Sequence, residues 1–214
     1  MIIHQLFGFL GDTEMPKMFS DNQILVKKFC KDNDYEYKLW TPKDVNEILE
    51  EYSKYRDMYD NVRYPIQKVD IIRFLLLHKY GGVYLDLDIQ PKIDKLKNYS
   101  FACCWRHVHK NNKILYEIEV LQSDTKNPIL LNYLDYVKTQ ISEKNNIEIY
   151  KKWKARYVYQ TTGPMSFTRF IKQNKIKVDL YKSNTTFRDS KTEINYATGD
   201  EDFITLPSFS WQET

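Results

Sequence analysis

Two aspartates separated by a single residue are the part of this chain best suited to chemistry. Asp86 and Asp88 end a run that begins at Val83 and reads as a buried strand. Alternate side chains of a strand point the same way, so Tyr84, Asp86 and Asp88 are predicted to share one face. Two carboxylates are costly to remove from water without a cation. The spacing therefore indicates a Mg²⁺ or Mn²⁺ site that could carry a diphosphate; the alternative is a strand-end pair held by Lys or Arg.

A second polar pair lies just upstream, in a segment with helical apolar spacing. Asp70 and Arg73 are three residues apart, which places them on one helix face. Arg73 could hold a phosphate or sugar oxygen through a forked contact, and Asp70 could accept hydrogen bonds from sugar hydroxyls. The alternative is a surface ion pair within the helix, worth roughly a few tenths of a kcal/mol.

The elements that must position these residues alternate between strands and helices along the chain. Strands are expected at 2–10, 35–40, 83–89, 100–108, 114–121 and 177–181. Helices are expected at 21–32, 41–52, 65–80, 129–142 and 164–172, the second beginning with Thr41 as N-cap and Pro42 in its first turn. This order predicts an α/β fold, a mainly parallel sheet flanked by helices, in a single domain over residues 1–214. In such sheets ligands bind beyond the carboxyl ends of the strands, where the acidic pair lies.

Composition narrows the class of protein. The chain of 214 residues has 32 Lys+Arg against 29 Asp+Glu, a net charge of +3 spread along the sequence, which does not favour a nucleic-acid partner. Three cysteines, two of them adjacent, argue against a disulfide framework and fit a reducing compartment. No signal-peptide layout opens the chain, and no apolar run is long enough to span a membrane. We expect a soluble cytoplasmic protein, either whole or one domain of a longer one.

The two polar pairs belong to one long pattern, Val69-Asp70-Ile71-Ile72-Arg73 followed by Gly81-Gly82-Val83-Tyr84-Leu85-Asp86-Leu87-Asp88. This pattern resembles the DXD-containing glycosyltransferase family, which includes capsular-polysaccharide transferases and yeast-type initiating α-1,6-mannosyltransferases. More distantly it resembles the catalytic domain of the large glucosylating toxins. The opening Ile2-Ile3-His4-Gln5-Leu6-Phe7-Gly8, the segment Tyr35 to Trp40, Thr162-Gly163-Pro164 and the terminal Ser210-Trp211 also have counterparts in the family.

The resemblance implies a GT-A fold, Mn²⁺ or Mg²⁺ as cofactor, and a nucleotide-diphosphate sugar as donor, with a UDP-sugar favoured over a GDP-sugar. A glycan or glycoconjugate hydroxyl would be the acceptor. The sugar would keep its anomeric configuration. No carboxylate is placed as a nucleophile, so we expect a front-side mechanism in which the leaving phosphate helps to deprotonate the acceptor.

The resemblance also assigns residues. Asp88 would bind the metal directly, with Asp86 as a second ligand that also contacts ribose or sugar, and Arg73 completes the catalytic group. Asp70 and Arg73 would grip the donor sugar and ribose. The other expected nucleotide-sugar contacts are Gln5, Leu6 and Phe7 around the nucleoside, Tyr84, and Ser210 and Trp211 from a mobile tail.

Three positions depart from the family pattern. Val69 stands where Ser is frequent, Phe7 stands where Trp is usual, and the His that often precedes the terminal Ser-Trp is missing, which leaves the third protein ligand of the metal open. Thr162 could be an acceptor contact or only a helix cap before Pro164. Two other functions remain open as well: a nucleotide-sugar hydrolase built on the same acidic pair, and a binding module without turnover.

Overall fold

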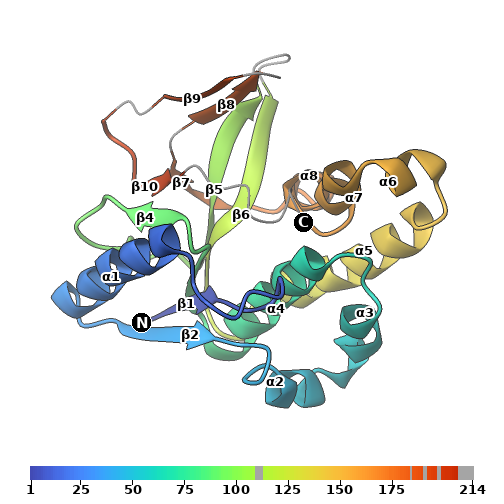
Figure 1. The fold of residues 1–214 in the computed structure, drawn as a ribbon, viewed down its shortest axis with the longest axis horizontal. Coiled ribbons are helices and arrows are strands. Elements are labelled where there is room, and N and C mark those ends of the chain that lie inside the picture. The colour runs from blue at the N-terminus through green and yellow to red at the C-terminus, as the bar shows by residue number, and fades with distance from the viewer. Residues whose placement is uncertain (109–112, 184, 190–191, 197–198, 207–214) are drawn as a thin grey trace.

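The computed structural model describes residues 1–108, 113–183, 185–189, 192–196 and 199–206 (Figure 1). The strands are β1 (Ile2–Leu6), β2 (Glu36–Trp40), β3 (Gly82–Leu85), β4 (Ile89–Pro91), β5 (Phe101–Val108), β6 (Lys113–Ser123), β7 (Asp179–Lys182), β8 (Thr185–Asp189), β9 (Thr192–Tyr196) and β10 (Phe203–Thr205). The helices are α1 (Lys17–Asp32), α2 (Asn46–Glu51), α3 (Arg56–Asp60), α4 (Pro65–Tyr80), α5 (Pro128–Lys144), α6 (Glu148–Lys152), α7 (Lys154–Thr161) and α8 (Pro164–Gln173), with a 3₁₀ turn at Ser53–Tyr55.

A six-stranded sheet in the order β2-β1-β3-β6-β5-β7 forms the centre of the molecule. Strand β1 pairs in parallel with β2 and β3, and β5 pairs in parallel with β7. Only β6 is antiparallel to its neighbours β3 and β5, so five of the six strands in this sheet run the same way. The expected mainly parallel α/β architecture is confirmed.

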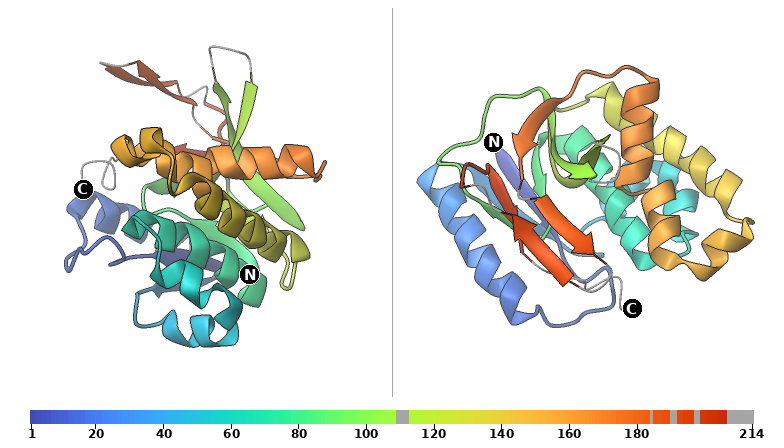
Figure 2. Two further views of the ribbon diagram at one scale, coloured as in Figure 1. Left: turned by 90° about the vertical axis from the view of Figure 1, so that its right-hand side faces the viewer. Right: turned by 90° about the horizontal axis from the view of Figure 1, so that it is seen from above.

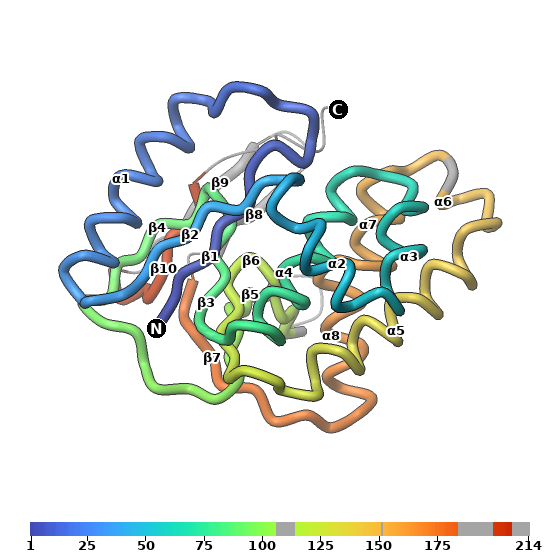
Figure 3. Tube along the Cα trace, turned by 90° about the horizontal axis from the view of Figure 1, so that it is seen from below, coloured from blue at the N-terminus to red at the C-terminus, as the bar shows by residue number. Residues whose placement is uncertain are grey.

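Helices cover both faces of this sheet. Figures 2 and 3 show α1 on one side and α4, α5 and α8 together on the other. The two faces bury separate apolar clusters, one containing Tyr84 and Leu121 and the other Val26, Val83 and Leu85. The alternation predicted for β3 is therefore confirmed as far as Leu85.

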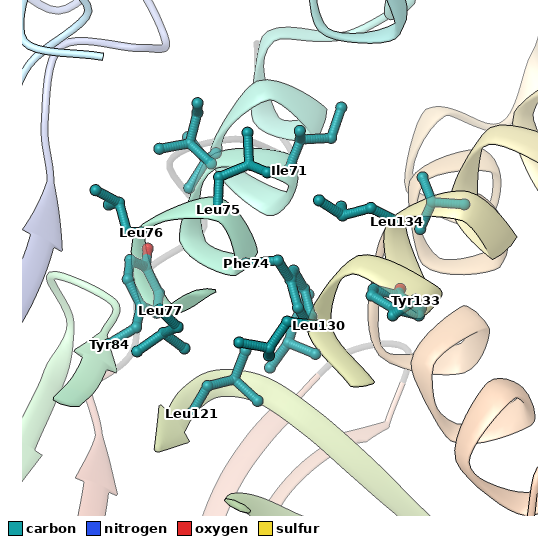
Figure 4. Packing of buried hydrophobic residues seen from close by; sticks show 14 of the residues in the cluster. Ile71, Phe74, Leu75, Leu76, Leu77, Tyr84, Leu121, Leu130, Tyr133 and Leu134 are labelled. Atoms are coloured by element: carbon teal, nitrogen blue, oxygen red, sulfur yellow. The ribbon is translucent and has the colours of Figure 1, made fainter. Parts of the chain in front are cut away.

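Helix α4 begins and ends where the sequence predicts. Pro65 opens it, the Gln67 side chain accepts from the backbone N–H of Tyr64 at 3.0 Å, and Gly81 ends it with a φ of 65°. The helix is apolar on nearly all sides, as expected of a helix inside a core. Figure 4 shows its side chains against α5 and β6, where the ring of Phe74 lies 4.6 Å from that of Tyr133. The polar side chains Gln67, Asp70 and Arg73 of α4 are therefore buried with it.

Several expected element boundaries are wrong: the strand expected over 2–10 ends at Leu6, the helix expected from residue 21 begins at Lys17, and two further differences have a local cause. The helix expected from Thr41 starts only at Asn46, because the Asp44 carboxylate accepts from both the backbone N–H of Thr41, at 2.8 Å, and its hydroxyl, at 2.6 Å. That local side-chain contact stabilises a turn in place of the first helical turn.

The strand expected over residues 83–89 is interrupted after Leu85. The backbone N–H of Ile89 donates to the carbonyl of Asp86 at 3.1 Å, which closes a turn. Asp86 and Asp88 therefore lie on this turn, named here the DXD turn (86–88), and the prediction that they share a strand face with Tyr84 is wrong. Among the described residues, no helix is both long and apolar enough to cross a membrane. Ser210 and Trp211 lie outside the described residues.

Candidate active site

The DXD turn lies at the edge where the parallel strands β1, β2 and β3 end. Main-chain contacts fix its first residue: the N–H of Asp86 donates to the carbonyl of Glu119 on β6 at 2.9 Å. The Gln5 side chain at the end of β1 donates to the carbonyl of Asp86 at 3.2 Å. The turn is thus bonded to both strands that flank β3.

Helix α1 and the segment just after β10 also donate hydrogen bonds to the DXD turn and to Ile89 next to it. Asn22 of α1 is buried, and its Nδ2 donates to the carbonyls of Leu87 at 2.9 Å and Ile89 at 2.8 Å. The N–H of Leu206, just after β10, donates to the carbonyl of Asp88 at 2.8 Å. The turn therefore presents its carboxylates on a backbone held by four separate segments.

The Asp86 carboxylate is hydrogen-bonded within the protein and also partly exposed to solvent. The hydroxyl of Tyr84 donates to its Oδ1 at 2.6 Å, and Nη1 of Arg73 lies 3.3 Å from the same atom. The Asp86 side chain is 31% exposed, whereas that of Arg73 is 3% exposed. The Arg73 guanidinium also lies over the Tyr84 ring, 4.5 Å from its centroid, which favours the cation.

Arg73 links Asp86 to a second carboxylate deeper in the protein. Its Nη2 lies 3.0 Å from Oδ1 of Asp70, and its Nη1 donates to the carbonyl of Ile118 at 2.7 Å. Asp70 accepts in turn from the hydroxyl of Thr162, at 2.6 Å. Both members of the pair are buried, so the alternative of a surface ion pair is excluded. We name Asp70, Arg73, Tyr84, Asp86, Asp88 and Thr162 the donor corner.

Burial and neighbouring charges decide the protonation of the pair. Burial raises the pKa of Asp70 to about 6, although Arg73 and the Thr162 hydroxyl each lower it. Burial disfavours the charged form of Arg73, but the nearby Asp86 carboxylate above all raises its pKa, so the guanidinium keeps its charge. At neutral pH the donor corner holds three carboxylates against one guanidinium. This excess of negative charge favours a bound cation.

The oxygen chemistry of the DXD turn fits Mg²⁺ or Mn²⁺. Asp88 is half-buried on the turn, and Asp86 has one oxygen engaged by Arg73 and Tyr84 and its outer side exposed. Within the part of the chain that the structure describes, no three Asp, Glu, His or Cys side chains converge to hold a metal. Two carboxylates would therefore hold the ion together with diphosphate, water or residues outside that part.

The remaining predicted contacts lie along the ends of β1 and β2. Gln5 is buried, and its side-chain amide oxygen Oε1 accepts from the hydroxyl of Tyr37 at 2.9 Å. Leu6 is also buried, and the N–H of the half-buried Phe7 donates to the carbonyl of Trp40 at 3.0 Å. These residues lie at the same sheet edge as the DXD turn, and their contacts with a nucleoside stay predictions.

His4 ties this edge to the start of β3. Its Nδ1 accepts from the indole N–H of Trp40 at 3.0 Å, so its Nε2 carries the proton and donates to the carbonyl of Gly81 at 2.8 Å. Burial lowers the pKa of His4 to about 4, and the imidazole stays neutral at physiological pH. Trp40 is therefore a core residue that orients His4.

Sequence reasoning missed two side chains of this site. Asn22 interrupts the buried stripe of α1 formed with Phe19, Val26 and Cys30, and a polar residue in an apolar stripe is a usable signal. Thr162 was weighed only as a cap or an acceptor contact, and its bond to Asp70 joins residues 92 positions apart. No pattern in the sequence indicates that pairing.

Fold and site together define a class: an α/β protein of GT-A type with a DXD turn at the carboxyl edge of its parallel strands. Among solved structures, it is similar to a glycosyltransferase titled PaToxG, with a TM-score of 0.59 and 17% identity, over 81% of this chain and 69% of that one. At this identity the likeness shows the fold alone.

Sequence comparison finds similar proteins. Residues 16–101 match the model described as the glycosyltransferase sugar-binding region containing the DXD motif. The chain is 31% identical to a mannosyl phosphorylinositol ceramide synthase of Saccharomyces cerevisiae over 81% of its own length and 42% of that protein. It is 38% identical to inositol phosphoceramide mannosyltransferase 3 of Schizosaccharomyces pombe over 46% of its length and 27% of that protein. The resemblance to DXD glycosyltransferases is confirmed, and the chain spans less than half the length of these relatives.

Proposed function

We propose that the protein is a metal-dependent glycosyltransferase that moves a sugar from a nucleotide-diphosphate donor to a hydroxyl of a glycan or glycolipid. The observation that carries this proposal is the DXD turn, whose Asp86 is bonded through Arg73 to the buried Asp70. A buried ion pair this well bonded holds a charged turn in one geometry, which a donor diphosphate and a metal need.

Each residue of the donor corner has a proposed role. Asp88 and Asp86 would hold Mn²⁺ or Mg²⁺, which neutralises charge on the departing diphosphate. Arg73 would position the Asp86 carboxylate. Asp70 forms an ion pair with Arg73 and remains the candidate to accept a hydrogen bond from a hydroxyl of the donor sugar. Direct grip of the donor by Arg73 stays a prediction, as do retention of configuration and a cytoplasmic location.

The relatives indicate which sugar and acceptor to test first. Their names describe transfer of mannose to inositol phosphoceramide, so mannose and an inositol-bearing lipid headgroup are our first candidates. A GDP-sugar therefore deserves a place beside the UDP-sugars favoured from the sequence. The chain matches only part of these relatives, and its own acceptor is to be found by assay.

The test is Asp88→Asn, assayed for release of nucleoside diphosphate and for transfer in the presence of Mn²⁺. Loss of a metal ligand should lower turnover by about 100-fold or more. Asp124→Asn is the matched control, because Asp124 lines a hollow of about 600 Å³ with Gly81 and Gly82 at the opposite, amino-end edge of the sheet.

Three outcomes separate the candidate functions. Transfer that fails in Asp88→Asn and persists in Asp124→Asn supports a transferase. Donor cleavage that no acceptor hydroxyl increases would favour the hydrolase. Donor binding with neither cleavage nor transfer would favour a binding module, and undiminished turnover in Asp88→Asn would remove the metal role assigned to the DXD turn.

A further inference from the structure

A corner of the helical layer exposes apolar side chains far from helix α1. In Figure 1, α6 lies at the outer end of α5 and α7, on the opposite side of the molecule from α1. Ile147 and Ile149 are exposed there, and Trp153 between α6 and α7 is 61% exposed. A tryptophan has a large apolar surface, and its exposure beside two isoleucines marks an interaction surface.

Basic residues concentrate around these apolar side chains. Residues 143–156 contain five of the chain's 32 basic residues and two of its 29 acidic residues, which leaves 27 of each elsewhere. The net positive charge of the whole chain therefore equals that of this one segment. Lys152 and Arg156 are exposed beside Trp153. We name Ile147, Ile149, Lys152, Trp153 and Arg156 the α6 patch.

The side of α6 and α7 opposite the α6 patch packs against the rest of the protein. Nη1 of Arg63 donates to the carbonyl of Tyr150 at 3.2 Å, and the Arg63 guanidinium lies 4.3 Å from the ring centroid of Tyr157. The rings of Tyr150 and Tyr157 meet edge to face at 6.2 Å. Trp153 breaks the helix between them, with a φ of −127° and a ψ of 87°.

Helix α7 connects the α6 patch to the donor corner. It has eight residues, a length of about 12 Å at the usual rise per residue. Trp153 precedes its first residue, and Thr162, which bonds Asp70, follows its last. Met165, at the start of α8, is also exposed. A surface that engages the α6 patch would therefore lie about one helix length from Thr162 of the donor corner.

We propose that the α6 patch docks the protein on an anionic lipid surface. Tryptophan and isoleucine side chains enter the boundary between headgroups and acyl chains, and Lys152 and Arg156 meet the negative headgroups. The proposal rests on the proposed function only in its link to a lipid-borne acceptor, whose headgroup would be presented at the end of α7. The binding itself is independent of turnover.

Helix α1 offers the contrast that makes this surface testable. It also exposes apolar side chains, Ile24 at 64% among them. Two of its four lysines, however, are paired with acids one turn away: Lys17 with Asp21 at 2.7 Å, and Lys28 with Asp32 at 2.5 Å. Ile24 is therefore a comparably exposed isoleucine on a helix where acids offset half of the lysines, and it gives a control for apolar exposure alone.

The experiment is flotation of the purified protein with vesicles of phosphatidylcholine, alone or mixed with phosphatidylinositol or with phosphatidylserine. We expect binding only to the mixed vesicles and weakening in high salt. The double variant Lys152→Gln/Arg156→Gln should bind about 25-fold more weakly, at about fivefold per basic residue. Trp153→Ser should also lose binding, while Ile24→Ser should bind like the parent.

The outcomes that overturn the proposal differ from those that overturn the proposed function. Absence of vesicle binding, equal loss in Ile24→Ser and Trp153→Ser, or self-association through Trp153 without vesicle binding each overturns docking on lipid. Equal binding to both anionic lipids assigns recognition to charge, and preference for phosphatidylinositol assigns it to the headgroup. Asp88→Asn should still bind vesicles, and Trp153→Ser should still cleave the donor in solution.

Discussion

At the scale of single residues, the two aspartates of the motif have unequal surroundings. Asp86 is bonded to Tyr84 and Arg73, whereas Asp88 lies further along the turn with its carbonyl held by Leu206. A carboxylate that is already paired with a guanidinium is a weaker ligand for a metal. Asp86 is therefore a candidate for orientation of the donor, and Asp88 keeps the direct ligation that the family resemblance implies.

Asp70 provides a pH prediction. Burial raises its pKa from an ordinary value of 3.8 to about 6 in the folded protein, so the folded state binds the proton more tightly than the unfolded state. The stabilisation from this group is complete below pH 3.8 and is lost as the pH rises through about 6. We expect the free energy of unfolding of the parent, relative to Asp70→Asn, to fall between these values by up to about 1.4 kcal/mol per pH unit.

Urea denaturation of both proteins across this pH window measures the difference. Donor binding should respond in the opposite direction, because only the ionised Asp70 forms an ion pair with Arg73 and is a charged acceptor for a hydroxyl. The dissociation constant of the donor should rise as the pH falls below 6 in the parent and stay flat in Asp70→Asn. A pH-independent stability difference would show that Asp70 titrates normally.

Much of the donor corner could be predicted at this scale, and the reason lies in local spacing. Asp70, Arg73, Asp86 and Asp88 are close in sequence. Helix spacing pairs the first two, and the short path through β3 brings Asp86 to Arg73, although Asp86 and Asp88 lie on a turn and not on a strand. The bond of Arg73 to the Ile118 carbonyl could not be predicted, because every residue carries such a carbonyl and only the tertiary fold selects one.

At the scale of elements, the accurate predictions concern segments with strong stop signals. Pro65 and Gly81 bound α4 as expected. The wrong predictions concern local hydrogen bonds that replace regular structure. The Asp44 side chain accepts from Thr41, and a main-chain bond from Ile89 to Asp86 ends β3 early. Both are tertiary or local hydrogen-bond choices that propensity does not resolve.

Gly82 gives the prediction at this scale. It joins α4 to β3 with a φ of 89°, and a Cβ built on it would lie 2.2 Å from the carbonyl oxygen of Ile2. Gly82→Ala must therefore strain the backbone and push β1 from β3, which positions the DXD turn. Gly11 has a similar φ of 99° with nothing within 4 Å, so Gly11→Ala isolates the strain.

Chemical denaturation should show a loss of roughly 1–2 kcal/mol in Gly11→Ala from the backbone conformation alone. Gly82→Ala should lose a further 1–3 kcal/mol, approximately, from the clash. Equal losses in the two variants would mean that β1 moves away from Gly82 without cost.

At the scale of the whole molecule, the donor corner gathers segments from nearly the full described length. Gln5, Asn22, Thr162 and Leu206 all bond the DXD turn or the pair behind it. The corner therefore exists only in the folded chain, and a donor that binds it must raise the free energy of unfolding. That coupling makes thermal shift with Mn²⁺ and a nucleotide-sugar a direct measure of donor binding.

The same coupling tests the terminal residues assigned from the family resemblance. Leu206 reaches the DXD turn through its bond to Asp88, and residues 207–214 continue from that point. If Ser210 and Trp211 contact the diphosphate, Ser210→Ala/Trp211→Ala should weaken donor binding by about 10-fold to 100-fold, the value of one charge-assisted hydrogen bond. The stability without donor should not change, because β10 and the Leu206 bond remain. Gln212→Ala is the neighbouring control. An unchanged thermal shift with donor and Mn²⁺ in the double variant would mean that the donor is held entirely by the residues of the sheet edge.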